Sequence, residues 1–288
     1  MANETTNTTL DDLISPLVAE ALFVANERSI MRGLVRNYTM PMNSGKTIQV
    51  PIYPTVSAAG VAEATDLTNT AISTSKADLT VSEVGVMTTL TDFARNVSES
   101  DVVSDLGRLF GEAIAKKIDT DLTALFSGFS QGVGDNASVM EPKDIFEAVA
   151  KLRANAVPAT DLACVIHPSI AFDLKSALAT QGNTPFGGNG QSELANEALR
   201  TGFVGTIAGV PVFETSNIAA NAGNAGDHKG AVFHKDALGL AMMQDLKIET
   251  QRDASLRATE IVATAVYGVG ELHDTYGIEL SADSSIVN

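Results

Sequence analysis

The most constraining feature of the sequence is a stretch of about 25 residues that has almost no large apolar side chains. It runs from Val56 to Thr80 and consists mainly of small and polar residues, VSAAGVAEATDLTNTAISTSKADLT. A loop of this length is uncommon in a compact domain unless it has a function of its own. Because the stretch cannot form a core layer by itself, we expect it to lie on something outside its own domain.

Strand-like runs lie on both sides of this stretch. Ile48, Val50 and Ile52 alternate with polar residues or proline. This pattern is typical of an edge strand, where Pro51 need not donate a ladder hydrogen bond. The second run, Leu79–Leu90, also alternates and is rich in β-branched residues. Since an isolated hairpin is only marginally stable in water, the sequence predicts a long two-stranded excursion that reaches a neighbouring molecule.

The segment Gly45-Lys46-Thr47, just before the first strand, resembles the end of a phosphate-binding loop, G-x-x-x-x-G-K-[ST]. The first glycine of that motif would stand where the chain has Met40, and a helix would have to follow the loop. A proline-bearing strand is expected instead, so we predict no nucleotide site. Gly45 should allow a sharp turn, Lys46 should carry a solvated or intersubunit charge, and Thr47 should begin the outward strand.

The strongest helical signal follows the second run. Apolar residues recur every three or four positions from Val102 to Phe129, as one buried stripe requires. Asp101 favours the positive end of the helix dipole, and the glycines from Gly128 onward are typical of a helix end. Lys117 and Asp121 have the spacing of an ion pair on the opposite face. At 1.5 Å per residue the helix would span about 40 Å, so we predict a long spine helix.

Two interpretations are open for the N-terminal segment. Apolar residues from Leu10 to Val35 have helical spacing, after a capping pattern at Thr9 and Asp12. The segment could pack on the protein's own core, or it could be an arm laid against a neighbouring subunit. It has no feature of a signal peptide, so we expect the protein to begin its life in the cytoplasm.

The second half of the chain favours a compact α/β unit followed by strands. A helix is predicted near Pro142, followed by an apolar strand (LACVIH) and a second helix (PSIAFDLKSALA). The segment FVGTIAGVPVFETSNI then predicts two strands joined by a turn at Gly209. From residue 235 to the end the pattern is mostly strand, which makes the whole chain an α+β protein.

Charge and residue types exclude several functions. The net charge of −16 opposes binding to nucleic acid, whose affinity comes largely from Lys and Arg. The single Cys164 rules out an intrachain disulfide and a multi-cysteine zinc site. It does not pair with His167 for catalysis, because residues three apart in a strand face opposite ways. The four histidines fit no metal-binding spacing, and the apolar runs are too short for a membrane span. We predict no catalytic residue, cofactor or metal.

Taken in order, these parts resemble the major capsid proteins of tailed bacteriophages, which have the Hong Kong 97-type shell fold. ISPLVAEALFVANERSIMRGLVRNYTM is similar to that family's N-terminal arm, and GKTIQVPIYP with the segment after it, including Glu63, is similar to its extended loop. GTIAGVPVFETSNI is similar to a strand–turn–strand of the axial domain, and ATAVYGVGELHDTYGIEL to the closing peripheral strands. The resemblance implies an N-terminal arm (1–40), an extended loop (41–92), a peripheral domain with the spine helix (93–140), an axial domain (141–234) and peripheral return strands (235–288).

The resemblance also implies a function. Pentamers and hexamers of the chain would close into an icosahedral shell around a double-stranded DNA genome, in a virion assembled in the host cytoplasm. The implied partners are further copies of the chain, a portal protein and a separate scaffolding protein, with a decoration protein as a further candidate. DNA would be contained without specific binding, and no membrane is involved. The candidate assembly residues are Gly45, Lys46, Thr47, Glu63, Lys76 and Gly209.

Some relatives cross-link a lysine to an asparagine between subunits. Lys76 lies in the extended loop, but the sequence identifies neither a partner asparagine nor a catalytic glutamate, so we predict no cross-link. Two alternative functions are kept. Encapsulin-type compartments share the fold and enclose an enzyme cargo. A flagellin-like or surface-layer protein would suit an acidic chain without tryptophan, although flagellins need long heptads at both ends and this C-terminus favours strands.

Overall fold

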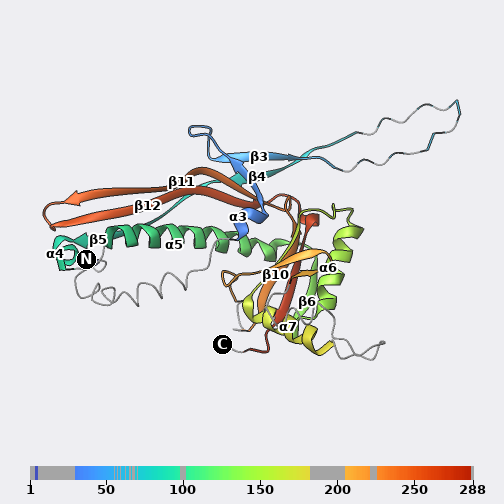
Figure 1. Cartoon of the computed structure of the whole chain (residues 1–288). Helices are drawn as coiled ribbons and strands as arrows, with labels where there is room; N and C mark the ends of the chain where they lie inside the picture. The colour runs from blue at the N-terminus through green and yellow to red at the C-terminus, as the bar shows by residue number, and fades with distance from the viewer. Residues whose placement is uncertain are drawn as a thin grey trace.

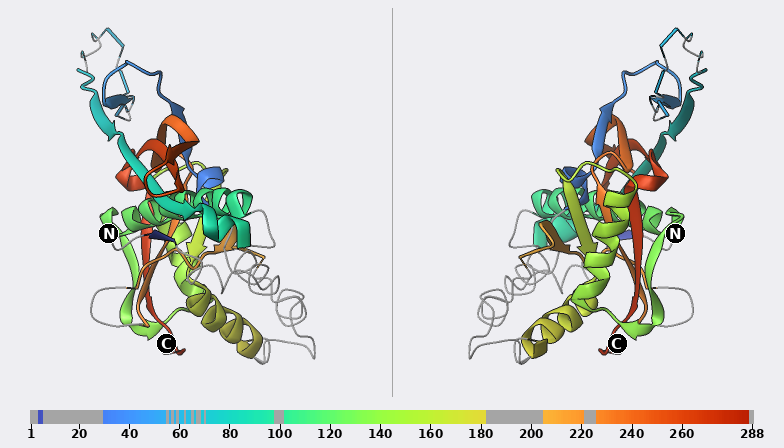
Figure 2. Two further views of the ribbon diagram at one scale, coloured as in Figure 1. Left: turned by 90° about the vertical axis from the view of Figure 1, so that its left-hand side faces the viewer. Right: turned by 90° about the vertical axis from the view of Figure 1, so that its right-hand side faces the viewer.

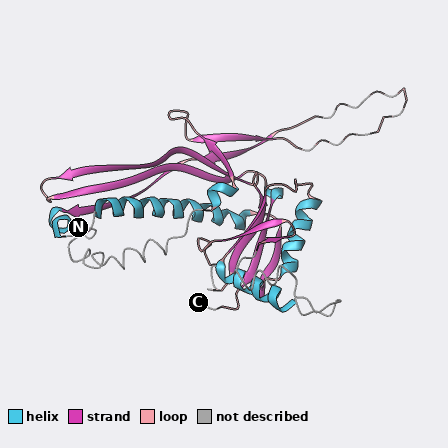
Figure 3. Cartoon of the chain, viewed as in Figure 1, coloured by secondary structure: helices cyan, strands magenta, loops and turns pink. Residues whose placement is uncertain are grey.

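The computed structural model describes residues 4–5, 30–181 and 205–286, apart from 98–101, 221–225 and scattered positions between 55 and 70. The described residues form an elongated unit, a compact unit and a two-stranded hairpin that projects away from both (Figures 1 and 3). We call them the peripheral unit, the axial unit and the extended hairpin.

The peripheral unit consists of helix α5 (Val102–Ala124) packed against a five-stranded sheet of order β1-β5-β12-β11-β2. The strands are β1 (Glu4–Thr5), β2 (Arg36–Thr39), β5 (Ser82–Thr91), β11 (Leu238–Asp253) and β12 (Ala258–Glu271). The short elements of this unit are helix α3 (Met31–Leu34), helix α4 (Asp92–Val97) and the 3-10 turn η2 (Leu125–Gly128).

Helix α5 confirms the predicted spine helix with shorter bounds. Phe110, Ile114 and Leu122, from the predicted apolar stripe, are buried in the core that α5 shares with the sheet. The helix has 23 residues. It ends before Phe129 because its last turn tightens into η2, where the N–H of Phe129 donates to the carbonyl of Phe126.

The axial unit is a six-stranded sheet of order β6-β13-β10-β7-β9-β8 with two helices. The strands are β6 (Gly132–Val139), β7 (Leu162–Ile166), β8 (Thr206–Ile207), β9 (Val210–Glu214), β10 (His228–His234) and β13 (Gly277–Asp283). The helices are α6 (Pro142–Ala154) and α7 (Pro168–Gln181), and the 3-10 turn η3 (Asp274–Tyr276) precedes β13. Figure 2 shows the two helices from two sides.

Strand β7 is buried on both faces, as its uninterrupted apolar sequence predicts. Cys164 and Ile166 belong to a core shared with α6 and α7. Ala163 and Val165 point the other way, into the core that contains the end of the spine helix. The axial sheet therefore lies between its own two helices and the C-terminal end of the spine.

Two strands that the sequence assigned to the peripheral region lie in the axial sheet. β6, from the 93–140 region, pairs in parallel with β13, from the 235–288 region, and β13 also pairs with β10. Parallel strands cannot be joined by a tight turn, so paired parallel strands are usually far apart in the sequence. Their pairing therefore leaves no local signal in the sequence, and chain order alone could not show it.

The extended hairpin pairs β3 (Thr47–Ile52) with β4 (Ser75–Thr80) in a two-stranded antiparallel sheet. The run that we predicted as one return strand, Leu79–Leu90, is divided at Val81 into β4 and β5. Val81 is buried, and its N–H donates to the carbonyl of Lys46 at 2.9 Å. The chain changes partners at this point, because β4 pairs with β3 whereas β5 pairs with β12.

Most of the predicted N-terminal arm lies outside the described residues. Glu4–Thr5 pairs in parallel with β5, and α3 buries Met31 in the core beside α5. Both interpretations of residues 10–29 therefore stay open. No helix in the described part of the chain combines the length and apolarity that a membrane span requires.

Candidate assembly surfaces

The far end of the extended hairpin exposes large apolar side chains. Tyr53 and Ile72 are 70% and 59% exposed, and Val56 and Val61 are exposed as well. The hairpin projects beyond the rest of the molecule (Figure 1), and in the described residues β3 and β4 pair only with each other. Apolar groups in this position gain free energy only when another surface covers them.

The base of the extended hairpin, in contrast, is anchored in a small apolar cluster. Leu79 is fully buried there, together with Met40, Val81, Ala241 and Leu272. Leu79 belongs to β4, and Val81 lies between β4 and β5. Met40 follows β2, Ala241 belongs to β11, and Leu272 follows β12. The hairpin is therefore fixed in direction at one end and uncovered at the other.

Two glycines of β12 let the base of the hairpin cross the sheet at close range. A Cβ atom on Gly268 would lie 2.3 Å from the carbonyl oxygen of Thr80, and one on Gly270 would lie 2.6 Å from Cδ2 of Leu79. A side chain at position 268 would thus displace backbone. We did not predict this role from the sequence, although the GVG spacing inside a strand pattern is a known signal of close backbone approach.

Gly45, Lys46 and Thr47 lie together at the turn before β3. Gly45 has a φ of +98°, a conformation that favours glycine, as the predicted sharp turn requires. Lys46 is exposed, and the hydroxyl of Thr47 lies 3.1 Å from that of Thr80 across the hairpin. A strand follows this turn, where a phosphate-binding loop would need a helix.

The structure does not bring the other three candidate residues to this turn. Lys76 lies in β4, with its Nζ 3.7 Å from Oδ2 of Asp78. Glu63 is exposed in the connection between β3 and β4. Gly209 lies in the axial unit, where it has a φ of +80° in the two-residue turn between β8 and β9. An assembly role for any of the six residues stays a prediction.

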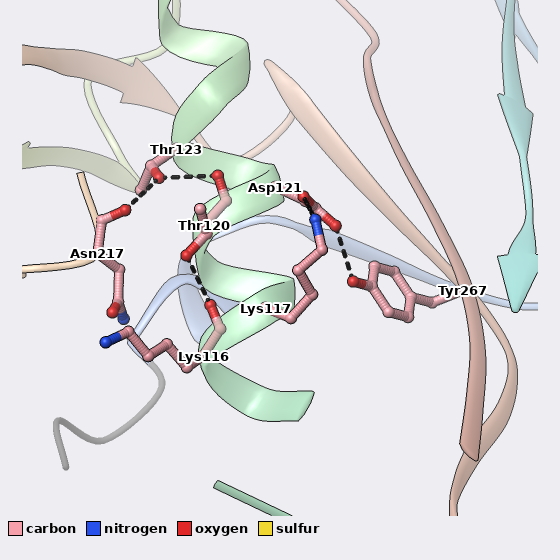
Figure 4. A network of polar contacts seen from close by, with 7 residues as sticks. All are labelled: Lys116, Lys117, Thr120, Asp121, Thr123, Asn217 and Tyr267. Carbon is pink, nitrogen blue, oxygen red and sulfur yellow. Dashed lines mark hydrogen bonds and ion pairs between the residues drawn. The ribbon is translucent and has the colours of Figure 1, made fainter. Parts of the chain in front are cut away.

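A polar network fixes the spine helix to its neighbours (Figure 4). Asp121 accepts a hydrogen bond from the Tyr267 hydroxyl of β12 at 2.8 Å, and it forms the predicted pair with Lys117 at 2.5 Å. Burial, followed by the contact with Asp121, raises the pKa of Tyr267. On the axial side, the Thr123 hydroxyl donates to the carbonyl of Asn217 at 3.2 Å. The spine is thus bonded to the sheet and to the axial unit.

The spine also holds the point where the arm enters the described structure. Asp119 is fully buried, and its Oδ2 accepts hydrogen bonds from the Ile30 N–H at 3.0 Å and from Nδ2 of Asn217 at 3.5 Å. A buried carboxylate requires such donors. Sequence reasoning missed Asp119, because an acidic residue on a helix is usually a surface residue.

The described residues show no catalytic arrangement around the single cysteine. Cys164 is fully buried, and burial raises the pKa of its thiol to about 12, which leaves little reactive thiolate. His167 follows β7, as predicted, and its Nδ1 lies 2.6 Å from the hydroxyl of Ser169. Within the described ranges, no three His, Cys, Asp or Glu side chains are grouped as metal ligands.

Comparison with known proteins gives this geometry a context. A family model described as "Phage capsid protein" matches residues 74–279. A search of curated proteins finds no match.

Solved structures with the same fold cover most of the chain. The capsid of cyanophage P-SCSP1u aligns with a TM-score of 0.68 and 24% identity over 90% of each chain. A protein of Mycobacterium phage Che8 aligns with a TM-score of 0.69 and 18% identity, over 88% of this chain and 91% of that one. An encapsulin complex from Synechococcus elongatus aligns with a TM-score of 0.65 and 12% identity, over 92% of this chain and 91% of that one. These likenesses confirm the predicted Hong Kong 97-type fold.

Proposed function

The chain belongs to the phage capsid protein family, and we propose that it is the major capsid protein of a tailed bacteriophage. The observation that carries this proposal is the extended hairpin. Its base is buried, whereas its far end exposes Tyr53 and Ile72 to solvent in the described structure. A chain with this fold and such a hairpin is completed by further copies of itself, so it forms the shell of the virion.

Each copy supplies one hairpin and receives another. Such a contact joins two different surfaces of the same chain, and contacts of this kind close into rings when the rotation between copies fits. We propose hexamers and pentamers that close into an icosahedral shell. The turn at Gly45, Lys46 and Thr47 directs the hairpin outward, Glu63 and Lys76 lie in its intersubunit part, and the Gly209 turn belongs near the centre of each ring.

The charge of the chain suits a wall around packaged DNA. A net charge of −16 opposes tight binding of phosphate backbones. Double-stranded DNA is therefore held by containment, without specific contacts. The same function calls for a portal protein at one vertex, a separate scaffolding protein during assembly in the host cytoplasm, and a decoration protein as a further candidate.

An encapsulin-type compartment is the second candidate function. The encapsulin complex from Synechococcus elongatus shares the fold at a TM-score of 0.65, so the fold does not separate the two functions. The family match favours the phage shell. A flagellin-like filament protein is disfavoured, because the C-terminal region forms the long strands β11 and β12 rather than heptad helices.

Negative-stain electron microscopy of the expressed full-length chain tests the proposal. We expect closed particles, capsomers or tubes, from the chain alone or with its scaffolding protein co-expressed. A strictly monomeric chain under both conditions would contradict it. The genes next to the coding sequence separate the two candidates, since a phage shell requires portal and terminase genes and an encapsulin requires a cargo enzyme.

A further inference from the structure

Three chain crossings join the peripheral and axial units. The first runs from η2 to β6, the second (235–237) from β10 to β11, and the third (272–276) from β12 to β13. The N–H groups of Leu272 and His273 both donate to the carbonyl of Ala237, at 2.8 and 3.2 Å. The second and third crossings are therefore bonded to each other.

The third crossing is also bonded to the first. The N–H of Ser130 donates to Oδ1 of Asp274 at 2.7 Å, and the Ser130 hydroxyl donates to the other carboxylate oxygen. All three crossings thus meet in one joint. Any rotation of the axial unit relative to the spine has to be accommodated there.

His234 is a buried titratable residue of this joint. It ends β10 and is 6% exposed. Its Nδ1 accepts a hydrogen bond from the backbone N–H of Asp236 at 3.1 Å, which closes the second crossing. An imidazole nitrogen accepts a hydrogen bond only while it carries no proton. The same Nδ1 lies 3.8 Å from Oδ2 of Asp236, so a proton on Nδ1 would have a carboxylate at close range.

Asp236 already has a partner in the peripheral unit. Its Oδ1 lies 2.6 Å from Nη1 of Arg36, the first residue of β2, and this hydrogen bond raises the pKa of Arg36. A hollow of about 440 Å³ opens the site to solvent. Its lining consists of Arg36, Asn37, Asp161, His234, Lys235 and Asp236.

We propose that His234 makes this joint a proton-sensitive switch between the two units. On acidification, Nδ1 takes a proton from solvent, loses the Asp236 N–H and donates to the Asp236 carboxylate instead. The imidazolium then competes with Arg36 for that carboxylate. The turn of the second crossing opens, β2 loses an ion pair at its first residue, and the axial unit gains freedom to rotate.

Aromatic and charged groups from several elements surround His234. His234 meets the ring of Tyr276 edge-on at 5.6 Å, and His273 stacks on the same ring at 4.8 Å. Burial lowers the pKa of His273, with smaller effects of Arg36 and His234 in the same direction and of Asp236 against it. The charged or titratable side chains around His234 are Arg36 of β2, Asp161 before β7, Lys235 and Asp236 of the second crossing, and His273 and Tyr276 of the third.

Charging both imidazoles would therefore crowd positive charge around one aromatic ring. Arg36 and Lys235 already line the hollow, and the carboxylates of Asp161 and Asp236 are the acidic groups in that lining. Like charges at this distance repel, and partial burial screens them less than bulk water would. Protonation of His234 therefore exchanges the Asp236 N–H contact, which closes the turn of the second crossing, for a contact with the Asp236 carboxylate.

Förster transfer between labels on the two units tests the switch in the full-length, unassembled chain. Lys143→Cys on α6 and Lys247→Cys on β11 give exposed labelling positions, and buried Cys164 stays unlabelled. We expect the transfer efficiency to differ between the chain at about pH 8 and the acidified chain at about pH 5. A constant efficiency over this range would overturn the proposal.

The His234→Asn variant tests whether protonation of His234 causes the change. The asparagine oxygen can still accept the Asp236 N–H but cannot be protonated, so we expect the pH-dependent change to disappear. His167→Asn is the matched control, because Nδ1 of His167 accepts the backbone N–H of Ser169 at 3.3 Å outside the joint. The control should respond as the parent chain does. A responsive His234→Asn chain or an unresponsive control would contradict the proposal.

Arg36→Gln provides a test that does not depend on replacing a buried residue. The Arg36 side chain is 53% exposed, so the variant should fold. Removing the competing cation leaves Asp236 free for the His234 imidazolium, and we expect the midpoint of the change to move to higher pH. An unchanged midpoint, or one moved to lower pH, would show that Asp236 is not the acceptor.

Discussion

The molecule contains two antiparallel hairpins that differ in how their apolar side chains are covered. The β11–β12 hairpin buries one face on the spine helix, through Ile261, Ala263, Ala265 and Tyr267. The β3–β4 hairpin buries only its base, and its far end is solvent-exposed in the described residues. Both have apolar alternation, so alternation alone does not decide stability. What matters is whether the chain supplies a second layer, and for β3–β4 the proposed second layer is another subunit.

Deleting Ala58–Lys76 should have the largest effect on the extended hairpin. The pairs from Thr47↔Thr80 to Val50↔Ala77 remain, so the subunit should stay folded with an unchanged thermal midpoint. Shell assembly should be abolished, because the intersubunit contact is gone. Electron microscopy and thermal unfolding would check both expectations.

The matched control removes a similar length, residues 247–264, from β11–β12. This deletion takes away part of the face packed on the spine, so the subunit itself should fail to fold. Intact shells from the Ala58–Lys76 deletion, or a stable subunit from the control, would remove the distinction between the two hairpins.

Single alanine substitutions sharpen the contrast between the base and the far end of the extended hairpin. Leu79 is fully buried, and Leu79→Ala should lower the free energy of unfolding by about 2–5 kcal/mol. Ile72 is 59% exposed, and Ile72→Ala should change it by less than about 0.5 kcal/mol. In light-scattering assays, however, Ile72→Ala should slow assembly. Equal losses of stability in urea unfolding would contradict an anchored base.

Gly268→Ala tests the close crossing of the two hairpins. A Cβ there would lie 2.3 Å from the backbone oxygen of Thr80, and we expect a loss of about 1–3 kcal/mol in unfolding free energy. Gly60→Ala is the control in the extended hairpin, because no atom lies within 4 Å of a Cβ at that position. Urea unfolding of both variants decides the matter, and a neutral Gly268→Ala would show that the crossing tolerates a methyl group.

The smallest expected effect is the contribution of His273, next to the end of β12, to the pH dependence of stability. Burial lowers the pKa of His273 in the fold, so below its ordinary value of about 6.5 the unfolded chain binds the extra proton first. The stability from neutral His273 is therefore present above about pH 6.5 and decreases as the pH falls through this window. His273→Gln should flatten the dependence of urea midpoints on pH between about 7 and 5.

Glu271 acts in the opposite sense in the same region. Burial and Asp274 raise the pKa of Glu271, so its contribution is present at low pH and is lost as the pH rises through the raised pKa. Comparing His273→Gln with Glu271→Gln separates the two contributions. Identical pH profiles for both variants and the parent chain would show that neither group matters for stability.

Elements with one local pattern were predictable. The apolar stripe of the spine, the buried strand β7 and the turn at Gly209 each follow from neighbouring residues. Asp119 and Gly268 were not predictable, because their roles depend on Ile30 and Thr80, which are distant in sequence. The same limit applies to the assembly residues, whose partners lie outside a single chain.

The sequence by itself determined the order of parts, the spine helix and the weak core of the extended hairpin. These follow from periodicity and residue size, which act over short distances along the chain. Only the tertiary structure decided that β6 and β13 join the axial sheet, that the return run divides at Val81, and that three crossings are bonded together through Ala237 and Asp274. Such features depend on contacts between residues far apart in sequence, and a local pattern carries no information about which distant partner a strand or a buried polar group will find.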